Sequence, residues 1–126
     1  MATGVKVFFD GGLRPLPAGM ETAVVIAGEA SVARDLGAGT SMEAEWRALI
    51  AAARLVVARG LGPVVLLGDA AAVVAQANAR VRASATHREH MATFDELRGA
   101  HGAMRVRHIR RSQNLAGHAL AAGHVR

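Results

Sequence analysis

Cysteine is absent from this sequence of 126 residues, and aromatic residues are scarce. Without cysteine there are no disulfide bonds, thiolate metal sites or cysteine nucleophiles, so any chemistry rests on Asp, Glu, His and Ser. The sequence also has no apolar run of about 18 residues, and its first residues lack the charged and apolar regions of a signal peptide. We therefore expect a cytoplasmic protein with no membrane partner.

The remaining composition is typical of one globular domain. Hydrophobic residues make up 52% of the sequence, and a chain of this length buries roughly two-thirds of its unfolded surface on folding. No repeat, low-complexity tail or linker is visible. We expect a single domain over residues 1–126, and the sequence indicates no obligate protein partner.

Positive charge exceeds negative charge. Lys and Arg total 15 against 10 Asp and Glu, a formal net charge of +5, and arginine supplies nearly all of the basic residues. Arginine matches phosphate with a planar fork of donors, which favours a nucleic-acid partner. A GC-rich genome produces the same bias, so charge alone does not decide. With no Tyr, one Trp and three Phe, base stacking is not expected to be the main mode of binding.

The apolar pattern predicts three strands followed by alternating helices and strands. Strand-like runs at 5–10 and 20–30 flank a Gly/Pro loop, and a third short strand is expected at 31–37. Apolar residues at helical spacing predict a helix from Ser41 to Arg59. The continuous apolar run at 63–69 predicts a strand buried on both faces. Helices at 70–80, 86–102 and 114–125 and a strand at 104–110 follow. This order indicates an α/β fold with helices packed on a sheet.

Two aspartates come at the ends of predicted strands. Asp10 ends the first strand, in VFFDGG, and Asp69 ends the apolar run, in LLGDAAAVV. Each has an ordinary structural explanation, because Asp-Gly is a common turn signal and an Asp between strand and helix is a good N-cap. Ligand sites of α/β sheets also lie at strand ends. The two carboxylates are therefore candidates for one shared cleft.

A third acid comes from the start of the long helix, where Glu43 and Glu45 are the candidates. Helical geometry points their side chains about 200° apart. Glu43 has Arg47 one turn on, the arrangement of an exposed i,i+4 ion pair, whereas small and apolar neighbours around Glu45 leave room for a ligand. We therefore favour Glu45. Crowded carboxylates repel each other, so the cluster implies a divalent cation, and hard oxygen ligands favour Mg²⁺ or Mn²⁺.

These residues lie in motifs that resemble the type I ribonuclease H family over nearly the whole chain. VFFDGG resembles the family's first-strand Asp-Gly motif, and TSMEAEWRALI resembles its Thr-Asn-Asn-x-x-Glu helix start. LLGDAAAVVAQ resembles the Asp-Ser strand end with a downstream Gln, and RHIRRSQNLAGHALA resembles the stretch Arg-x-x-Asn-x-x-Ala-Asp-x-Leu-Ala. The resemblance implies a ribonuclease H-like fold, with a mixed five-stranded sheet and helices on both faces.

The resemblance also implies an endoribonuclease that hydrolyses the RNA strand of RNA–DNA hybrids. It assigns Asp10, Glu45 and Asp69 to two metal ions, about 4 Å apart, that bind the scissile phosphate and activate water. Specificity for RNA would come from its 2′-hydroxyls, and the products would carry 5′-phosphate and 3′-hydroxyl ends. The residues implied to contact the nucleic acid are Gly11, Thr40, Ser41, Arg110 and Asn114.

The family's fourth carboxylate falls at His118, which the resemblance places among the catalytic and metal-binding residues. Four interpretations remain open. The imidazole ligates a metal, moves a proton near the leaving group, marks a domain that has lost catalysis, or only packs on its helix. The alternative function is therefore a catalytically weak or inactive ribonuclease H-like domain that binds nucleic acid.

Other departures from the family concern substrate binding. Met42 stands where the family often has Asn, and Ala70 replaces the usual Ser after the third acid. No basic segment rich in Lys and Trp occurs between Ala79 and Thr86. Contact with a hybrid would then depend on scattered arginines, namely Arg80, Arg82, Arg88, Arg110 and Arg111.

Overall fold

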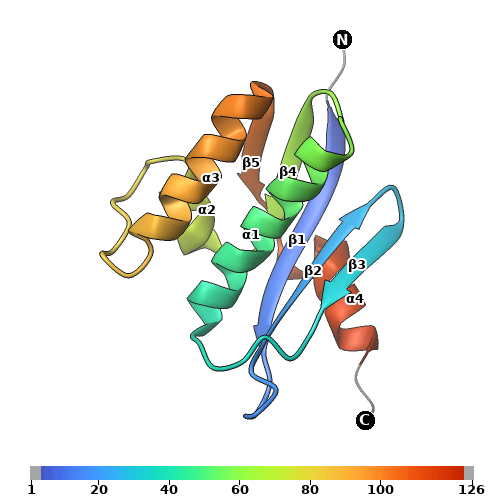
Figure 1. The fold of residues 1–126 in the computed structure, drawn as a ribbon. Helices are drawn as coiled ribbons and strands as arrows, with labels where there is room; N and C mark the ends of the chain where they lie inside the picture. The colour runs from blue at the N-terminus through green and yellow to red at the C-terminus, as the bar shows by residue number, and fades with distance from the viewer. Residues whose placement is uncertain (1–3, 124–126) are drawn as a thin grey trace.

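A computed structural model describes residues 4–123, which form a five-stranded sheet with helices on both faces (Figure 1). The elements in chain order are β1 (Val5–Leu13), β2 (Met20–Ile26), β3 (Glu29–Ala33), α1 (Ser41–Ala58), β4 (Val64–Gly68), α2 (Ala71–Ala77), α3 (Arg88–His101), β5 (Met104–His108), the short 3-10 helix η1 (Arg111–Gln113) and α4 (Leu115–Ala122).

The sheet is mixed, as predicted. Its strand order is β3-β2-β1-β4-β5. The first three strands pair antiparallel, whereas β1, β4 and β5 are parallel neighbours. Figure 1 shows α1, α2 and α3 on one side of the sheet and α4 on the other, against β1 and β2. The predicted α/β fold, a mixed five-stranded sheet with helices on both faces, is confirmed.

One strand prediction was wrong. The run 20–30 was expected to form a single strand, but β2 ends at Ile26 and β3 begins at Glu29. Between them Ala27 and Gly28 have φ of 51° and 80°, which is the backbone of a two-residue hairpin turn. The third strand therefore lies at Glu29–Ala33 rather than at 31–37. The helix expected at 114–125 ends at Ala122, and residues 124–125 of that range lie outside the described residues.

The main core lies between the sheet and the three helices on its first side. Trp46 of α1 is fully buried there and packs edge-on against Phe94 of α3, with ring centroids 6.4 Å apart. Its Nε1–H donates to Oε1 of Gln76 in α2 at 2.9 Å, so the buried indole has a partner. This packing fixes α1 against the sheet, and with it the acidic residues at the start of the helix. Within residues 4–123, no helix combines the length and apolar character that crossing a bilayer requires.

Candidate active site

Three carboxylates meet at one end of the sheet. Asp10 comes from β1, Asp69 directly follows β4, and Glu45 reaches them from the first turns of α1. Each offers an oxygen that lies within 4.8 Å of the other two. Because β1 and β4 are parallel neighbours, their carboxyl ends lie at the same edge of the sheet, where ligand sites of such sheets form. The cluster expected from the sequence is present.

Neither aspartate has the structural role that its sequence context suggested. Asp10 is not in a turn, because β1 continues to Leu13 and Asp10 pairs with Ala23 of β2. Asp69 does not cap a helix, because the N-cap position of α2 is Ala70 and no side chain bonds to that helix start. Their positions are explained by the cluster instead.

The position of Glu45 depends on a glycine. The Gly11 backbone N–H donates to Oε1 of Glu45 at 2.7 Å. A Cβ atom at Gly11 would overlap the carbonyl group of Ala44, so only glycine lets β1 approach α1 this closely. Glu43 lies on the other side of the helix and pairs with Arg47 at 3.3 Å. The choice of Glu45 over Glu43 agrees with this geometry.

Asn114 holds Asp69 from the start of α4, and this corrects an expectation. Its side chain is fully buried, so it has no surface with which to contact a nucleic acid. Its Nδ2 donates to Oδ2 of Asp69 at 3.2 Å and to the Phe9 carbonyl at 3.0 Å. Its Oδ1 accepts from the Ala116 N–H at 3.1 Å, which caps the helix. Asn114 therefore positions a carboxylate and joins α4 to β1.

The carboxylates perturb one another's protonation. Burial, and then the charge of Asp69, raises the pKa of Asp10 from 3.8 to about 6. Burial, and then the charge of Asp10, raises the pKa of Glu45 from 4.5 to about 8. The hydrogen bond between these two side chains lowers the pKa of Asp10 and raises that of Glu45, so the protonated Glu45 carboxyl donates to the Asp10 carboxylate. Without a metal, this site therefore holds a proton at neutral pH.

A cleft of about 730 Å³ opens beside Asp10, between β1 and α4. His118 lines this cleft and is exposed, but among the described residues it does not belong to the group whose ligand atoms lie within 4.8 Å of one another. The neighbouring Gly117 approaches Asp10 closely, since a Cβ there would lie 3.2 Å from Oδ2. His118 thus lies at the rim of the site, while Gly117 faces the carboxylate.

Arg111 also lines the cleft, and its importance was underestimated from the sequence. Its positive charge lowers the pKa of the Asp10 carboxyl. The turn that carries Arg111 is closed by the Asn114 N–H, which donates to the Arg111 carbonyl at 3.1 Å. The Arg-x-x-Asn spacing was the available signal for this arrangement.

The other residues expected to contact nucleic acid lie around the cluster. Thr40 is the N-cap of α1, where its side chain accepts from the Glu43 N–H at 3.0 Å. Thr40 and Ser41 are both exposed, and so is Arg110, which precedes η1. Gly11 lines the cleft. Thr40, Ser41 and Arg110 therefore offer exposed side-chain donors.

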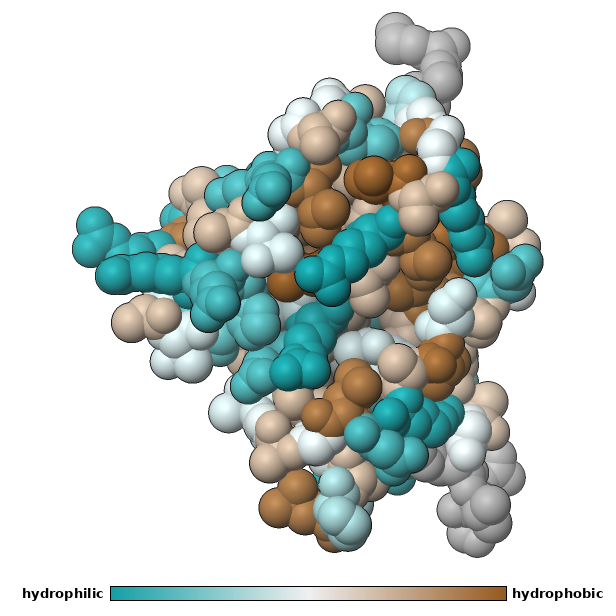
Figure 2. Space-filling view, in the orientation of Figure 1, coloured by the Kyte–Doolittle hydropathy of each residue, from teal (hydrophilic) through white to brown (hydrophobic). Residues whose placement is uncertain are grey.

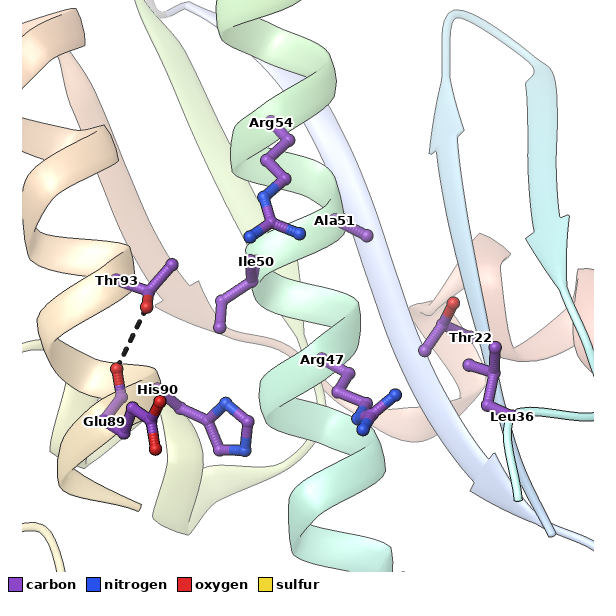
Figure 3. A pocket seen from close by; sticks show the side chains of 9 residues that line it. All are labelled: Thr22, Leu36, Arg47, Ile50, Ala51, Arg54, Glu89, His90 and Thr93. Carbon is purple, nitrogen blue, oxygen red and sulfur yellow. Dashed lines mark hydrogen bonds between the residues drawn. The ribbon is translucent and has the colours of Figure 1, made fainter.

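A second groove, of about 390 Å³, lies on the outer side of α1 and α3 (Figure 3). Arg47 and Arg54 extend over it from α1, and His90 points into it from α3. Arg47 follows Glu45 by two residues, so the two side chains point to nearly opposite sides of the helix. This groove is therefore separate from the carboxylate cluster.

The three clustered carboxylates fit a divalent cation. The raised pKa values of Asp10 and Glu45 indicate that the protein's own groups do not fully compensate the negative charge. A divalent cation would replace these protons. The cluster offers oxygen donors alone, which are the ligands preferred by Mg²⁺ and Mn²⁺.

Solved structures of ribonucleases H share this architecture. RNase H1 of the halophilic archaeon Halobacterium salinarum NRC-1 matches with a TM-score of 0.77 at 24% identity, over 92% of this chain and 92% of that one. LC11-RNase H1, isolated from compost by a metagenomic approach, matches with a TM-score of 0.79 at 24% identity, over 94% and 93% of the two chains. The structure of LC11-RNase H1 in complex with RNA/DNA hybrid gives a TM-score of 0.74 at 21% identity, over 87% and 88%.

The protein shares the fold of these ribonucleases H. Residues 23–124 match the reverse transcriptase-like family. The chain therefore belongs to the reverse transcriptase-like family, which is ribonuclease H-like. No curated protein matches the sequence.

Proposed function

We propose that this protein is a metal-dependent endoribonuclease that hydrolyses the RNA strand of RNA–DNA hybrids. The observation that carries the proposal is the cluster of Asp10, Glu45 and Asp69, whose oxygens lie within 4.8 Å of one another on a ribonuclease H-like fold. The similar LC11-RNase H1 has been solved with an RNA/DNA hybrid. This likeness supports a hybrid as the substrate.

The three carboxylates would hold two divalent ions, Mg²⁺ or Mn²⁺. When bound, such ions polarise a phosphoryl oxygen and lower the pKa of water. The chain's own residues keep the acids in place for this purpose. The Gly11 N–H fixes Glu45 at 2.7 Å, and the Asn114 amide fixes Asp69 at 3.2 Å.

The substrate's phosphates would meet donors around the cluster. The exposed Thr40 and Ser41 lie at the N-terminus of the 18-residue helix α1, where free backbone N–H groups and the helix dipole favour an anion. Arg110 and Arg111 add positive charge on the side of α4. Gly11 lines the cleft beside Asp10, and we assign it to the contact with the nucleic acid.

A further group of arginines lies in the connection between α2 and α3 and at the first residue of α3. Arg80, Arg82 and Arg88 line a surface hollow of about 580 Å³. Phosphate contacts of this kind provide affinity and position the substrate without reading its sequence. We infer that these three side chains contact the phosphates of the hybrid.

A second function remains a candidate because of His118. The carboxylate group contains three members in the described part of the chain, and the imidazole lies outside it. A site with one carboxylate fewer holds divalent ions less tightly, so a domain that binds nucleic acid and cuts it weakly, or not at all, is the alternative.

Cleavage assays separate the two functions. Labelled RNA–DNA hybrid, duplex DNA and duplex RNA would be incubated with Mg²⁺ or with Mn²⁺, for the natural chain and for Asp10→Asn. If the protein is the proposed nuclease, the natural chain should cleave the hybrid alone, and Asp10→Asn should not cleave it. Binding of the hybrid without cleavage under either metal would support the alternative.

A further inference from the structure

The side of the sheet that carries α4 is not covered evenly. Helix α4 contacts β1, β2 and β3, whereas β4 and β5 lie further along the sheet. Strand register places two rows of side chains across β1, β4 and β5 on this side, which we call the open-face rows. The first row is Phe8, Leu67 and Arg107, and the second is Lys6, Val65 and Arg105.

The open-face rows combine positive charge with an apolar floor. Lys6, Arg105 and Arg107 are exposed. Val65 and Leu67 between them are buried, with only 6% and 8% of their surface exposed. No acidic residue occupies a position in either row.

The rows lie beside the candidate active site. Asp10 and Asp69 follow Phe8 and Leu67 by two residues, so they lie at the next row of the same sheet face. Successive rows are about 7 Å apart along the strands. The sheet face thus runs from an acidic row, where the metal ions would bind, to two basic rows.

We propose that the open-face rows bind a single-stranded extension of the nucleic acid whose hybrid part occupies the carboxylate cluster. The proposal rests on the proposed function and adds a second contact region to it. The cations pair with phosphates, each contact releasing counterions. Phe8 packs against the apolar cluster under α4 and stays half-buried, so the exposed part of its ring suits an unstacked base, which a duplex keeps hidden between its strands.

Binding measurements without metal test this assignment. A short blunt RNA–DNA hybrid and the same hybrid with a single-stranded extension would be titrated in EDTA, followed by fluorescence anisotropy over a range of salt. The natural chain should bind the extended hybrid more tightly. The double variant Lys6→Ala, Arg107→Ala should lose this gain, and its salt slope for the extended hybrid should fall by about 0.7 per cation removed.

The outer side of α1 supplies a matched control. Figure 2 shows hydrophilic side chains along it, and Arg47 and Arg54 extend there over the separate groove (Figure 3). Arg47→Ala with Arg54→Ala removes the same charge and should keep the gain from the extension. If the extension brings no gain, if the gain survives in the Lys6 and Arg107 variant, or if the control loses it equally, the proposal is overturned.

The same set of proteins separates this proposal from the proposed function. The extension effect is measured in EDTA, and Asp10→Asn should retain it. Cleavage of the blunt hybrid with metal is measured independently, and Lys6→Ala with Arg107→Ala should leave that rate unchanged. If the natural chain does not cleave the hybrid but still binds the extended hybrid more tightly, the proposed nuclease activity is refuted and the second contact region is not.

Discussion

Replacing Glu45 with Gln is expected to stabilise the metal-free protein at neutral and alkaline pH. Glu45 lies half-buried between Asp10 and Asp69, and burial together with these charges raises its pKa from 4.5 to about 8. Gln keeps the shape and an oxygen that accepts from the Gly11 N–H. It removes only the charge that the other acids repel.

The direction of the effect follows from proton linkage. The folded chain binds the Glu45 proton more tightly than the unfolded chain does, so the stability that this proton contributes is complete below pH 4.5 and is lost as pH rises to about 8. At about 1.4 kcal/mol per unit, the full shift corresponds to roughly 5 kcal/mol above pH 8 and roughly 3 kcal/mol at pH 7. Because the side chain keeps some contact with water, we expect Glu45→Gln to gain on the order of 2–3 kcal/mol at pH 8.

Urea unfolding in EDTA at pH 4.5 and pH 8.5 measures this gain. The variant and the natural chain should differ little at the lower pH and diverge at the higher one. Glu43→Gln, on the opposite side of the same helix, is the control, since losing its exposed pair with Arg47 should change stability by less than about 1 kcal/mol at either pH. A Glu45→Gln variant that is no more stable than the natural chain at pH 8.5 would show that the carboxylates do not repel one another.

Three further changes test the surroundings of the cluster. Asn114→Ala removes two side-chain hydrogen bonds and a helix cap, so the free energy of unfolding in urea should fall by about 2–4 kcal/mol. Calorimetry should also show weaker binding of Mn²⁺. An unchanged free energy of unfolding and an unchanged Mn²⁺ affinity would contradict the positioning role of Asn114. Trp46→Phe leaves the buried Gln76 oxygen without its donor and should lower the free energy of unfolding, measured by thermal unfolding, by about 1–3 kcal/mol. Adding Gln76→Leu to the same chain should recover part of this stability. No recovery would argue against the loss of that hydrogen bond as the cause. His118→Asp adds a carboxylate at the cleft and should tighten Mn²⁺ binding by calorimetry, whereas unchanged affinity would place this side chain out of reach of the ions.

Much of the site could be predicted because it depends on local spacing. The positions of Glu43 and Glu45 on a helix decided which one faces away from Arg47, and the structure agrees. The ends of two apolar strands placed Asp10 and Asp69 at the same edge of the sheet. Helical and strand periodicity carry this information directly.

The remaining features depend on contacts between distant segments. The Asp-Gly-Gly run resembles a turn, yet here it continues β1 because Gly11 and Gly12 pair with Thr22 and Glu21 of β2. The close approach of Gly11 to α1 is likewise a tertiary contact. Composition and periodicity do not encode which strand lies beside another.

The end of the chain illustrates the same limit. Asn114 was expected to meet nucleic acid, but its amide is enclosed between β1, Asp69 and α4. Arg111 was one of several scattered arginines, and only the fold brings it to the cleft beside Asp10. In the same way, the fold and not the sequence motif shows that His118 lies beside the carboxylate group and outside it.

The most direct measurement is cleavage of an RNA–DNA hybrid labelled in each strand, with Mg²⁺ or Mn²⁺, by the natural chain and by folded Asp10→Asn. The three-carboxylate site predicts cuts in the RNA strand alone, 5′-phosphate and 3′-hydroxyl ends, no cutting in EDTA and none by the variant. A folded natural chain that binds the hybrid and leaves both strands intact with either metal would contradict it.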